Sequence, residues 1–415
     1  MKINKYFPVT FVYFFLNSVA LPASLLYTTL LTPFFYLWLV LRRQRYVLAK
    51  FVLPMFPFAL VQLGNGVDEF FYAKSVAYYF TVYIFTYACY VLAKSYDGWP
   101  ALFEKITWYN FAFTLLSIVL FVTPYQELVW YVTTVSEGIT RFPRLAMLTY
   151  EASYYSTLLV PLFAFYFLRL LLGKVTQQNV LFTLMLAFSL ILSFSMGVLA
   201  GLALSFAVLI LFHLRRFLSR KSVLYPFLSL LLLGGLGLIL LFVVYPENPL
   251  TVRIYNILEG TDSSGRGRTF EAFELAYLVA ETKSVWWGVG PGQIKVAGDY
   301  IIRSFYGMTP AGELSVTIPC TFAETLAIFG LIGAAVRFLA TWYLFFRTRV
   351  YNNYFRLFLF IYIFIYQFTG SFITNVAEYV IWVFAFVNVF PEFDKSPAAG
   401  PQPVRDNLRG QEVLA

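Results

Sequence analysis

Long apolar runs fill most of this sequence, and they restrict the folds that the chain can adopt. An α-helix needs about twenty apolar residues to cross a bilayer, and most of these runs reach that length. Charged residues make up only 12% of the chain, whereas soluble domains contain roughly 25%. The mean hydropathy is +0.72. We therefore predict an all-α polytopic membrane protein, with many passes through the bilayer.

The apolar runs divide into about twelve predicted transmembrane helices. Two runs, 6–41 and 180–214, are each long enough for two helices, and turn-forming residues at 21–24 and 193–197 can divide them. The predicted spans are 6–21, 24–41, 46–64, 72–93, 106–123, 151–172, 179–194, 197–214, 223–245, 319–346, 354–371 and 374–391.

The lysines and arginines favour one orientation of these spans. With both termini in the cytoplasm, 20 of the 30 basic residues fall on the cytoplasmic side and eight on the outer side, which agrees with the positive-inside rule. The predicted organisation is then nine spans in 1–245 with an outer loop at about 124–150, a large outer loop at 246–318, three spans in 319–393, and a disordered cytoplasmic tail at 394–415.

Several classes of chemistry lack the residues that they need. The chain has one histidine, His213, and two cysteines, Cys89 and Cys320, which lie in or beside apolar runs. We therefore predict no disulfide framework, no metal site and no cofactor. Topology explains the net charge of +9, so no nucleic-acid partner is predicted. The segment GVGPGQ (288–293) lacks the Gly-Lys-Ser/Thr of a phosphate loop, and we interpret it as a tight turn with exposed backbone N–H groups.

Arginines in the two outer loops oppose the topological bias, so topology does not explain them. Arg141 and Arg144 lie in the first loop, and Arg266, Arg268 and Arg303 lie in the second. A guanidinium group stays charged and binds phosphate oxygens through two parallel hydrogen bonds. These five residues are therefore candidate anion-binding groups. For each single arginine, simple solvation or contact with lipid headgroups stays open as an alternative.

The polar stretch TDSSGRGR (261–268) resembles the start of a helix. Ser263 or Ser264 is placed to cap a helix through 270–281, where apolar residues recur at helical spacing. An anion is favoured at such a helix N-terminus. A capped amphipathic helix lying on the membrane surface is an equally good interpretation.

Four segments carry a family resemblance. RTFEAFELAYLVAETKSVWWGVGPGQ (268–293), followed by ETLAIFGLIGA (324–334), resembles the O-antigen polymerase and O-antigen ligase superfamily in its order of an Arg, a helix, a glycine turn and a helix ending in G-x-x-G. RLAMLTYEASYYSTLLVPL (144–162) resembles the upstream family segment, in which an Arg precedes Glu-x-Ser. LSFSMGVLAGL (192–202) resembles the family's Ser-rich helix pair. The motifs are short, but their order fits across most of the chain.

The resemblance implies a GT-C-type glycosyltransferase that uses undecaprenyl-diphosphate-linked glycans at the periplasmic face of the bacterial inner membrane. A polymerase moves the growing chain onto a new lipid-linked repeat unit, whereas a ligase moves it onto lipid A core. The ligase pattern has a His followed by Asn, Ser or Gln where this sequence has Pro319 and Cys320. We therefore expect a polymerase for O-antigen, exopolysaccharide or a related surface polysaccharide. The implied partners are the lipid-linked donor and acceptor, membrane lipids and a chain-length regulator.

Candidate site residues follow from these arginines and carboxylates. Preorganised cations stabilise charge that develops on a leaving diphosphate. We assign Arg266 and the catalytic Arg268 to the donor diphosphate, and Arg141, Arg144 and Arg303 to either lipid-linked substrate.

Three carboxylates are candidate bases for the acceptor hydroxyl. Glu151 is the first choice, because partial burial at the outer end of a span can raise its pKa towards a useful value. Glu324 is the second, since a carboxylate inside a span suggests a role, and Asp262 is the third. An ordinary helix-start glutamate and a structural ion pair stay open as alternatives for the first two.

Further residues complete the predicted site. Tyr154 and Trp287 are candidates for stacking on sugars, and Gln293 is assigned to substrate binding. Arg337 lies within a predicted span, so we expect it to face the bundle interior and pair with a carboxylate, with Glu378 as the candidate.

Two other functions stay open. One is ligase-type transfer to lipid A core or another acceptor. The other is a flippase for lipid-linked oligosaccharides, although transporters usually show internal repeats and ionisable sites at mid-membrane.

Overall fold

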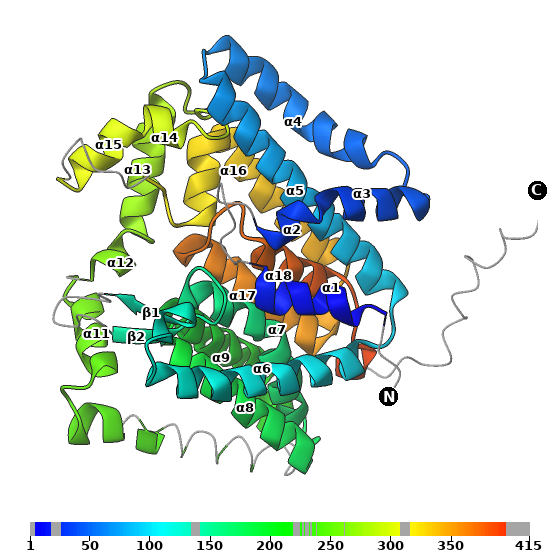
Figure 1. The fold of residues 1–415 in the computed structure, drawn as a ribbon, viewed down its shortest axis with the longest axis vertical. Helices are drawn as coiled ribbons and strands as arrows, with labels where there is room; N and C mark the ends of the chain where they lie inside the picture. Colours follow the sequence, from blue (N-terminus) through cyan, green and yellow to red (C-terminus); the bar gives the residue numbers. More distant parts are fainter. Residues whose placement is uncertain are drawn as a thin grey trace, which may run out of the picture.

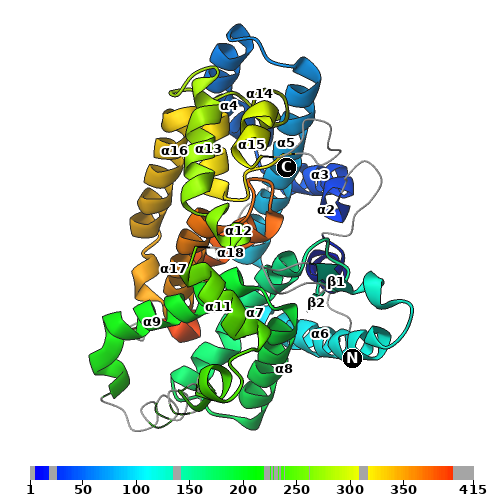
Figure 2. The same cartoon turned by 90° about the vertical axis from the view of Figure 1, so that its left-hand side faces the viewer.

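The computed structural model describes residues 5–17, 26–133, 142–218, 225, 228, 232, 235–237, 239–260, 262–307 and 316–395. Most of these residues are helical, and the helices pack into one bundle (Figure 1). A group of shorter helices from the large loop lies along one side of the bundle, as the second view shows (Figure 2).

The elements divide at the large loop. Those before it are α1 (Phe7–Phe11), η1 (Val12–Leu16), α2 (Tyr27–Leu30), α3 (Thr32–Leu41), α4 (Val47–Gly64), α5 (Glu69–Ser95), α6 (Trp99–Phe121), η3 (Gln126–Leu128), β1 (Trp130–Thr133), β2 (Phe142–Leu145), α7 (Ala152–Leu171), α8 (Gln177–Ser193), α9 (Met196–Leu218) and η4 (Leu240–Val244). Those in the loop and after it are α11 (Pro249–Leu258), α12 (Ser263–Arg266), α13 (Phe270–Glu281), α14 (Ile294–Ala297), α15 (Asp299–Phe305), α16 (Thr321–Arg347), η5 (Val350–Asn352), α17 (Tyr354–Thr369), α18 (Val376–Phe386) and η6 (Pro391–Phe393).

Among the described residues, five helices are long and apolar enough to cross a membrane: α4, α5, α7, α16 and the Met196–His213 part of α9. A sixth is added if Gly235–Val244 and Pro249–Leu258, which are bent by 87°, form one broken span. Shorter apolar helices of 10–17 residues occupy other predicted spans: Phe7–Leu16, Thr32–Leu41, Gln177–Ser193, Tyr354–Thr369 and Val376–Phe386. The chain is thus a mostly helical protein with the composition of a multi-pass membrane protein.

Some predicted spans are shorter in the structure. The stretch 374–391 contains only the 11-residue helix α18, which is roughly 16 Å long at 1.5 Å per residue. The helix stops because Val387 adopts an extended conformation. The predicted turn at 21–24 and nearly all of the predicted tail lie outside the described residues. The predicted break near 193–197 is confirmed, because Phe194 has a φ of +45° between α8 and α9.

A two-stranded hairpin lies in the loop predicted at 124–150, where sequence reasoning predicted no strand. β1 and β2 are antiparallel, with Trp130 opposite Leu145 and Tyr131 opposite Arg144. The Trp130 indole is buried and its Nε1 donates to the Ser117 carbonyl at 2.7 Å. This contact fixes the hairpin on the end of α6.

A glycine breaks α16 in its middle. Gly330 has φ +66° and ψ −168°, values that interrupt a helix and that a residue with a side chain rarely adopts. The segment 285–290 fills the break and replaces the lost helical contacts. Four backbone hydrogen bonds join the two segments: Val289 N–H to Ala327 C=O at 2.9 Å, Gly290 N–H to Ile328 C=O at 3.0 Å, Leu331 N–H to Val285 C=O at 2.9 Å, and Ile332 N–H to Trp286 C=O at 3.2 Å.

These bonds correct one expectation. The turn at 288–293 was expected to expose its backbone N–H groups, but those of Val289 and Gly290 donate into α16. The glycine turn is therefore a joint between the loop and the bundle. Gln62 of α4 secures this joint, since its Nε2 donates to the carbonyls of Trp287 at 2.8 Å and Ile328 at 2.9 Å.

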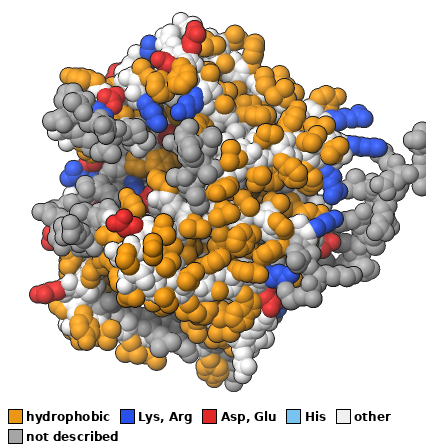
Figure 3. Space-filling model, in the orientation of Figure 1, with side chains coloured by type: hydrophobic (Ala, Val, Ile, Leu, Met, Phe, Trp, Pro, Cys, Tyr) orange, Lys and Arg blue, Asp and Glu red, His pale blue; other side chains and the backbone are white. Residues whose placement is uncertain are grey.

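The end of the bundle that lies away from the large loop carries many basic residues, and we call it the basic end. In Figure 3, Lys and Arg side chains gather along the right-hand edge, on the side where α3 ends in Figure 1, and hydrophobic side chains cover the middle. Here Glu392 bridges Arg169 and Lys174, with both N···O distances at 2.8 Å. Burial opposes ionisation of Glu392, but the hydrogen bonds from Lys174 and Arg169 outweigh it and lower the pKa of this carboxyl.

The joint at Gly330 gives a first prediction. A Cβ at Gly288 would lie 2.3 Å from the Ile328 carbonyl oxygen, and Gly288 has a φ of +72°. Gly288→Ala should lower the free energy of unfolding by about 2–3 kcal/mol or more, measured by thermal unfolding in nanodiscs. Gly197→Ala, where nothing described lies within 4 Å of the new Cβ, should be neutral or slightly stabilising, because alanine favours a helix more than glycine does. Equal unfolding temperatures for the two variants would show that the contact between segment 285–290 and the break at Gly330 does not stabilise the fold.

The Glu392 bridge gives a pH-dependent prediction. Because the folded pKa of Glu392 is lowered from 4.5, its stabilisation is complete above pH 4.5 and disappears as the pH falls through the lowered value. Glu392→Gln should therefore lower stability at pH 7 by roughly 0.5–1 kcal/mol, and the difference from wild type should vanish at strongly acidic pH. Glu127→Gln, at an exposed glutamate, is the control. A difference that is independent of pH would contradict this assignment.

Candidate functional site

Two predicted catalytic residues meet although 117 positions separate them in sequence. Glu151 is the N-cap residue of α7, but its side chain makes no capping hydrogen bond. Its carboxylate instead lies 3.5 Å from Nη2 of Arg268, which follows α12. The side chains are 15% and 30% exposed, respectively, so the pair is accessible from the loop side.

A second arginine of the predicted set, Arg144, approaches the same pair from β2. It is buried, and its Nε donates to the Ser193 carbonyl at 3.2 Å, at the end of α8. Burial lowers the pKa of Arg144 to about 10, Glu151 opposes this effect, and the positive charges of Arg253 and Arg268 lower the pKa further. Arg144 therefore lies within electrostatic range of all three groups.

The third arginine, Arg253 of α11, was not assigned to the site from the sequence. It is only 9% exposed, and its Nε donates to Asp262 Oδ2 at 3.1 Å. Its Nη1 is buried and has no hydrogen-bond partner among the described residues. Its place in a predicted outer loop is the one signal in the sequence that could have identified this arginine, whereas its pairing with Asp262 depends on the fold.

Asp262 has a structural role in this arrangement. Its Oδ1 accepts the Gly265 N–H at 2.8 Å, so Asp262 caps the short helix α12. The side chains of Ser263 and Ser264, the capping residues that the sequence predicts, lie outside the described part of the structure. Its Oδ2 is bound to Arg253. The predicted helix at 270–281 is present as α13, but it begins anew at Phe270. Asp262, the third candidate base, thus has both carboxylate oxygens engaged.

These contacts leave an excess of positive charge at the site. Arg144 lies within electrostatic range of Arg253, Arg268 and Glu151, so three arginines are balanced by only two carboxylates, Glu151 and Asp262. Arginines that are desolvated and incompletely paired favour an anionic ligand, because the ligand supplies the missing charge and acceptors. The arrangement can therefore bind a multiply charged anion such as a diphosphate.

The site continues towards the start of α16. Tyr154 packs its ring against Tyr150 at a centroid distance of 5.2 Å. Its hydroxyl lies within electrostatic range of Glu151 and of Glu324. Glu324 Oε2 accepts the backbone N–H of Ile373 at 2.7 Å, so this candidate base also anchors the linker between α17 and α18.

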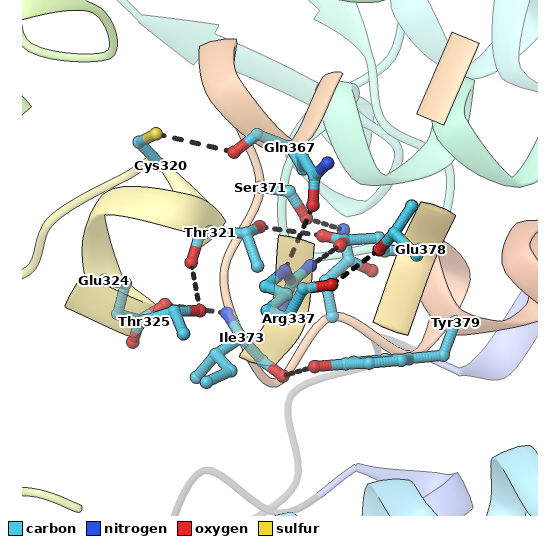
Figure 4. Close-up of polar contacts among 12 residues, drawn as sticks. Cys320, Thr321, Glu324, Thr325, Arg337, Gln367, Ser371, Ile373, Glu378 and Tyr379 are labelled. Atoms are coloured by element: carbon cyan, nitrogen blue, oxygen red, sulfur yellow. Dashed lines mark hydrogen bonds and ion pairs between the residues drawn. The ribbon is translucent and has the colours of Figure 1, made fainter. Parts of the chain in front are cut away.

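Behind Glu324 lies a buried ion pair (Figure 4). The predicted pairing of Arg337 with Glu378 is confirmed, since Arg337 Nη2 binds Glu378 Oε1. Glu378 is fully buried, and its Oε2 accepts the Thr321 hydroxyl at 2.7 Å. Because Thr321 precedes the break in α16 and Arg337 follows it, Glu378 holds the two halves of the helix together.

Other predicted site residues lie apart from these arginines or have other contacts. Arg266 is exposed and pairs with Glu271 at 2.7 Å, and Arg303 pairs with Asp299 at 2.9 Å within α15. The Trp287 ring packs on Phe58 of α4. Gln293 bonds both the backbone N–H and the carbonyl of Asp68, and Arg141 lies outside the described residues. In the described part of the chain, no group of three or more His, Cys, Asp or Glu side chains could hold a metal ion.

The buried pair gives a third prediction. Arg337→Leu leaves the Glu378 carboxylate buried without its cation, and this should lower the free energy of unfolding by about 3–5 kcal/mol. The double variant Arg337→Leu/Glu378→Leu removes both charges and should be more stable than the single variant. Unfolding of the four proteins of this double-mutant cycle measures the coupling. Additive effects of the two substitutions would show that the pair does not hold the helix.

No protein-family model and no curated protein matches this chain. An inference about its function therefore depends on the charge, burial and contacts of these side chains, together with the sequence pattern.

Proposed function

We propose that this protein is a GT-C-type glycosyltransferase that polymerises undecaprenyl-diphosphate-linked repeat units into O-antigen or a related surface polysaccharide at the periplasmic face of the bacterial inner membrane. The observation that carries the proposal is the arginine cluster in which Arg144 lies within electrostatic range of Arg253, Arg268 and Glu151. The motifs that resemble the O-antigen polymerase and ligase superfamily supply two of these arginines and the carboxylate.

The arginines suit the diphosphate of the lipid-linked donor. Arg268 is the most accessible of the three, with 30% of its side chain exposed, so it can make the first contact with a phosphate. Arg144 and Arg253 are buried and held by Ser193 and Asp262, so their charges are fixed before the substrate arrives. Cations that are already in place stabilise a leaving group without the cost of reorganisation.

The proposed reaction is a single displacement at the anomeric carbon of the donor sugar. A hydroxyl oxygen of the acceptor glycan forms the new glycosidic bond as the bond from the anomeric carbon to the diphosphate oxygen breaks. The hydroxyl proton passes to the Glu151 carboxylate, and undecaprenyl diphosphate leaves with its negative charge held by the arginines. No oxidant or further reactant is needed.

The contact between Arg268 and Glu151 indicates that the donor binds before Glu151 accepts the proton. At 3.5 Å the pair is long for a charge-assisted hydrogen bond, which normally measures about 2.7–2.9 Å. A phosphate oxygen competes well for the same guanidinium group. Binding of the donor would then free Glu151 to accept the proton only when the diphosphate is in place.

Topology supports the periplasmic placement. The arginine site lies beside α11 and α12, on the left-hand side of Figure 1, whereas many lysines and arginines gather along the right-hand edge in Figure 3. The positive-inside rule assigns that basic edge to the cytoplasm. The proposal retains twelve spans, with both termini in the cytoplasm.

The position of the histidine favours a polymerase over a ligase. His213 lies near the C-terminal end of α9, where its Nδ1 contacts the Leu209 carbonyl at 3.1 Å and its ring packs edge-on against Tyr354. The Lys395 ammonium lies 5.3 Å from the centre of the same Tyr354 ring. His213 therefore lies at the basic end of the bundle. The ligase histidine belongs instead just before the G-x-x-G helix, where this chain has Pro319 and Cys320.

The test of the proposal is a polymerisation assay on the full chain in nanodiscs, with a synthetic lipid-diphosphate-linked repeat unit. Wild type should give a ladder of glycans by gel or mass spectrometry. Arg268→Ala should slow the reaction by about 10²–10³-fold, as expected for loss of one preorganised donor, and Glu151→Gln should slow it comparably. Lys283→Gln, at an exposed lysine of the same loop that contacts the Asn65 carbonyl, should leave the ladder unchanged.

Each outcome separates one hypothesis from another. An unchanged ladder in Arg268→Ala would keep the polymerase and reject this site. Transfer of the glycan to lipid A core alone would indicate a ligase. With the same protein in proteoliposomes, movement of intact substrate across the bilayer without a new glycosidic bond would indicate a flippase.

A further inference from the structure

An apolar cavity lies between α1 and η1, α3, α5, α6 and α18, away from the arginine site. Its volume is about 100 Å³, and it is lined mainly by aromatic and aliphatic side chains from five separate segments, among them Phe14, Phe35, Phe85 and Phe384. Among the described residues, no Lys, Arg, Asp or Glu side chain lines it. Such a cavity suits a hydrocarbon chain.

Two hydrogen-bond donors in the cavity wall find no acceptor in the described ranges. Tyr13 is 6% exposed and Trp99 is 4% exposed, and both line the cavity. In the part of the chain that the structure describes, neither the Tyr13 hydroxyl nor Trp99 Nε1 has a hydrogen-bond partner. A buried donor without an acceptor is unfavourable, so these two groups point to a ligand that carries acceptor oxygens close to its hydrocarbon chain.

The cavity reaches the surface that faces the bilayer. Phe34 lines it and is 63% exposed, and Leu37 on the same helix is 56% exposed. A ligand can therefore enter sideways from the membrane. Water-soluble ligands would have to cross this apolar surface first.

Positive charges stand beside the same cavity. The Lys5 ammonium lies 5.1 Å from the centre of the Tyr6 ring, and the Arg42 guanidinium lies 5.6 Å from the Trp38 ring. Tyr6 and Trp38 both line the cavity. The neighbouring segments add Arg43, Arg45, Lys94 and Lys105 against the carboxylates Asp97 and Glu104, so cations are in excess here. This excess favours an anionic headgroup.

We propose that this cavity binds an anionic glycerophospholipid of the leaflet at the basic end. A part of one acyl chain enters the aromatic cavity, ester carbonyl oxygens accept hydrogen bonds from Tyr13 and Trp99, and the phosphate lies near Lys5 and Arg42. An isoprenoid chain fits less well, because it carries no acceptor along its hydrocarbon. The cavity is thus a structural lipid site, separate from the binding of the glycan carrier, and it does not depend on the proposed transferase activity.

The test uses the full chain, delipidated in detergent and then given dioleoyl-phosphatidylglycerol, dioleoyl-phosphatidylethanolamine or undecaprenyl phosphate. Native mass spectrometry counts retained lipid, and thermal unfolding measures its effect. Wild type should retain phosphatidylglycerol best. Tyr13→Phe and Trp99→Phe should each weaken retention by roughly five- to tenfold, the loss expected for one hydrogen bond. Lys5→Gln/Arg42→Gln should reduce the preference for phosphatidylglycerol over phosphatidylethanolamine.

The sign of the change in unfolding temperature shows whether the Tyr13 hydroxyl binds the lipid or is an unsatisfied buried group. Without a ligand, Tyr13→Phe removes an unsatisfied buried hydroxyl and should leave the unfolding temperature equal or higher. With bound phosphatidylglycerol it should lower that temperature. Trp108→Phe and Tyr46→Phe, at exposed residues outside the cavity, should change neither retention nor unfolding.

Ala88→Phe adds an independent test, since Ala88 lines the cavity and a larger side chain there would fill it. It should abolish retention of phosphatidylglycerol. Unchanged retention in Tyr13→Phe, Trp99→Phe and Ala88→Phe would overturn the proposal. Stronger retention of undecaprenyl phosphate than of phosphatidylglycerol would also overturn it.

Discussion

The structure depends on one constraint, which is that backbone polar groups in an apolar environment need hydrogen-bond partners. Gly330 interrupts α16 and frees several of these groups. The segment 285–290 from the large loop supplies the partners. The loop is therefore tied to the bundle at a fixed point. Because α13 leads directly into this segment, the same joint also limits where α12 and Arg268 can lie.

Buried charged side chains need partners for the same reason. Glu378 is fully buried and engages Arg337 and Thr321, so a single carboxylate holds both halves of the broken helix. At the arginine site the compensation is incomplete, because Arg253 Nη1 has no partner within the described residues and the contact of Arg268 with Glu151 is long. The first arrangement suits structural support. The second suits an anionic ligand, whose binding completes the missing contacts.

The sequence predicted part of this site and missed part of it. Arg268, Glu151 and Arg144 were identified because arginines in outer loops oppose the topological bias and because the motifs resemble a known family. Arg253 was missed, since its pairing with Asp262 has no signature in spacing or composition. Gln293 was assigned to substrate, but the fold places its amide on the backbone of Asp68. A short motif cannot distinguish a residue that contacts a ligand from one that fixes a loop.

Hydropathy and periodicity by themselves determined that this chain is helical and rich in apolar helices, because apolar runs of sufficient length are local properties of the sequence. The pairing of Arg337 with Glu378 could also be predicted, since a lone charge in an apolar helix requires a partner. Only the tertiary structure decided that the glycine turn enters the break at Gly330, and that Arg253 joins the other arginines. Those contacts join segments far apart in the chain, and their geometry depends on how the helices pack.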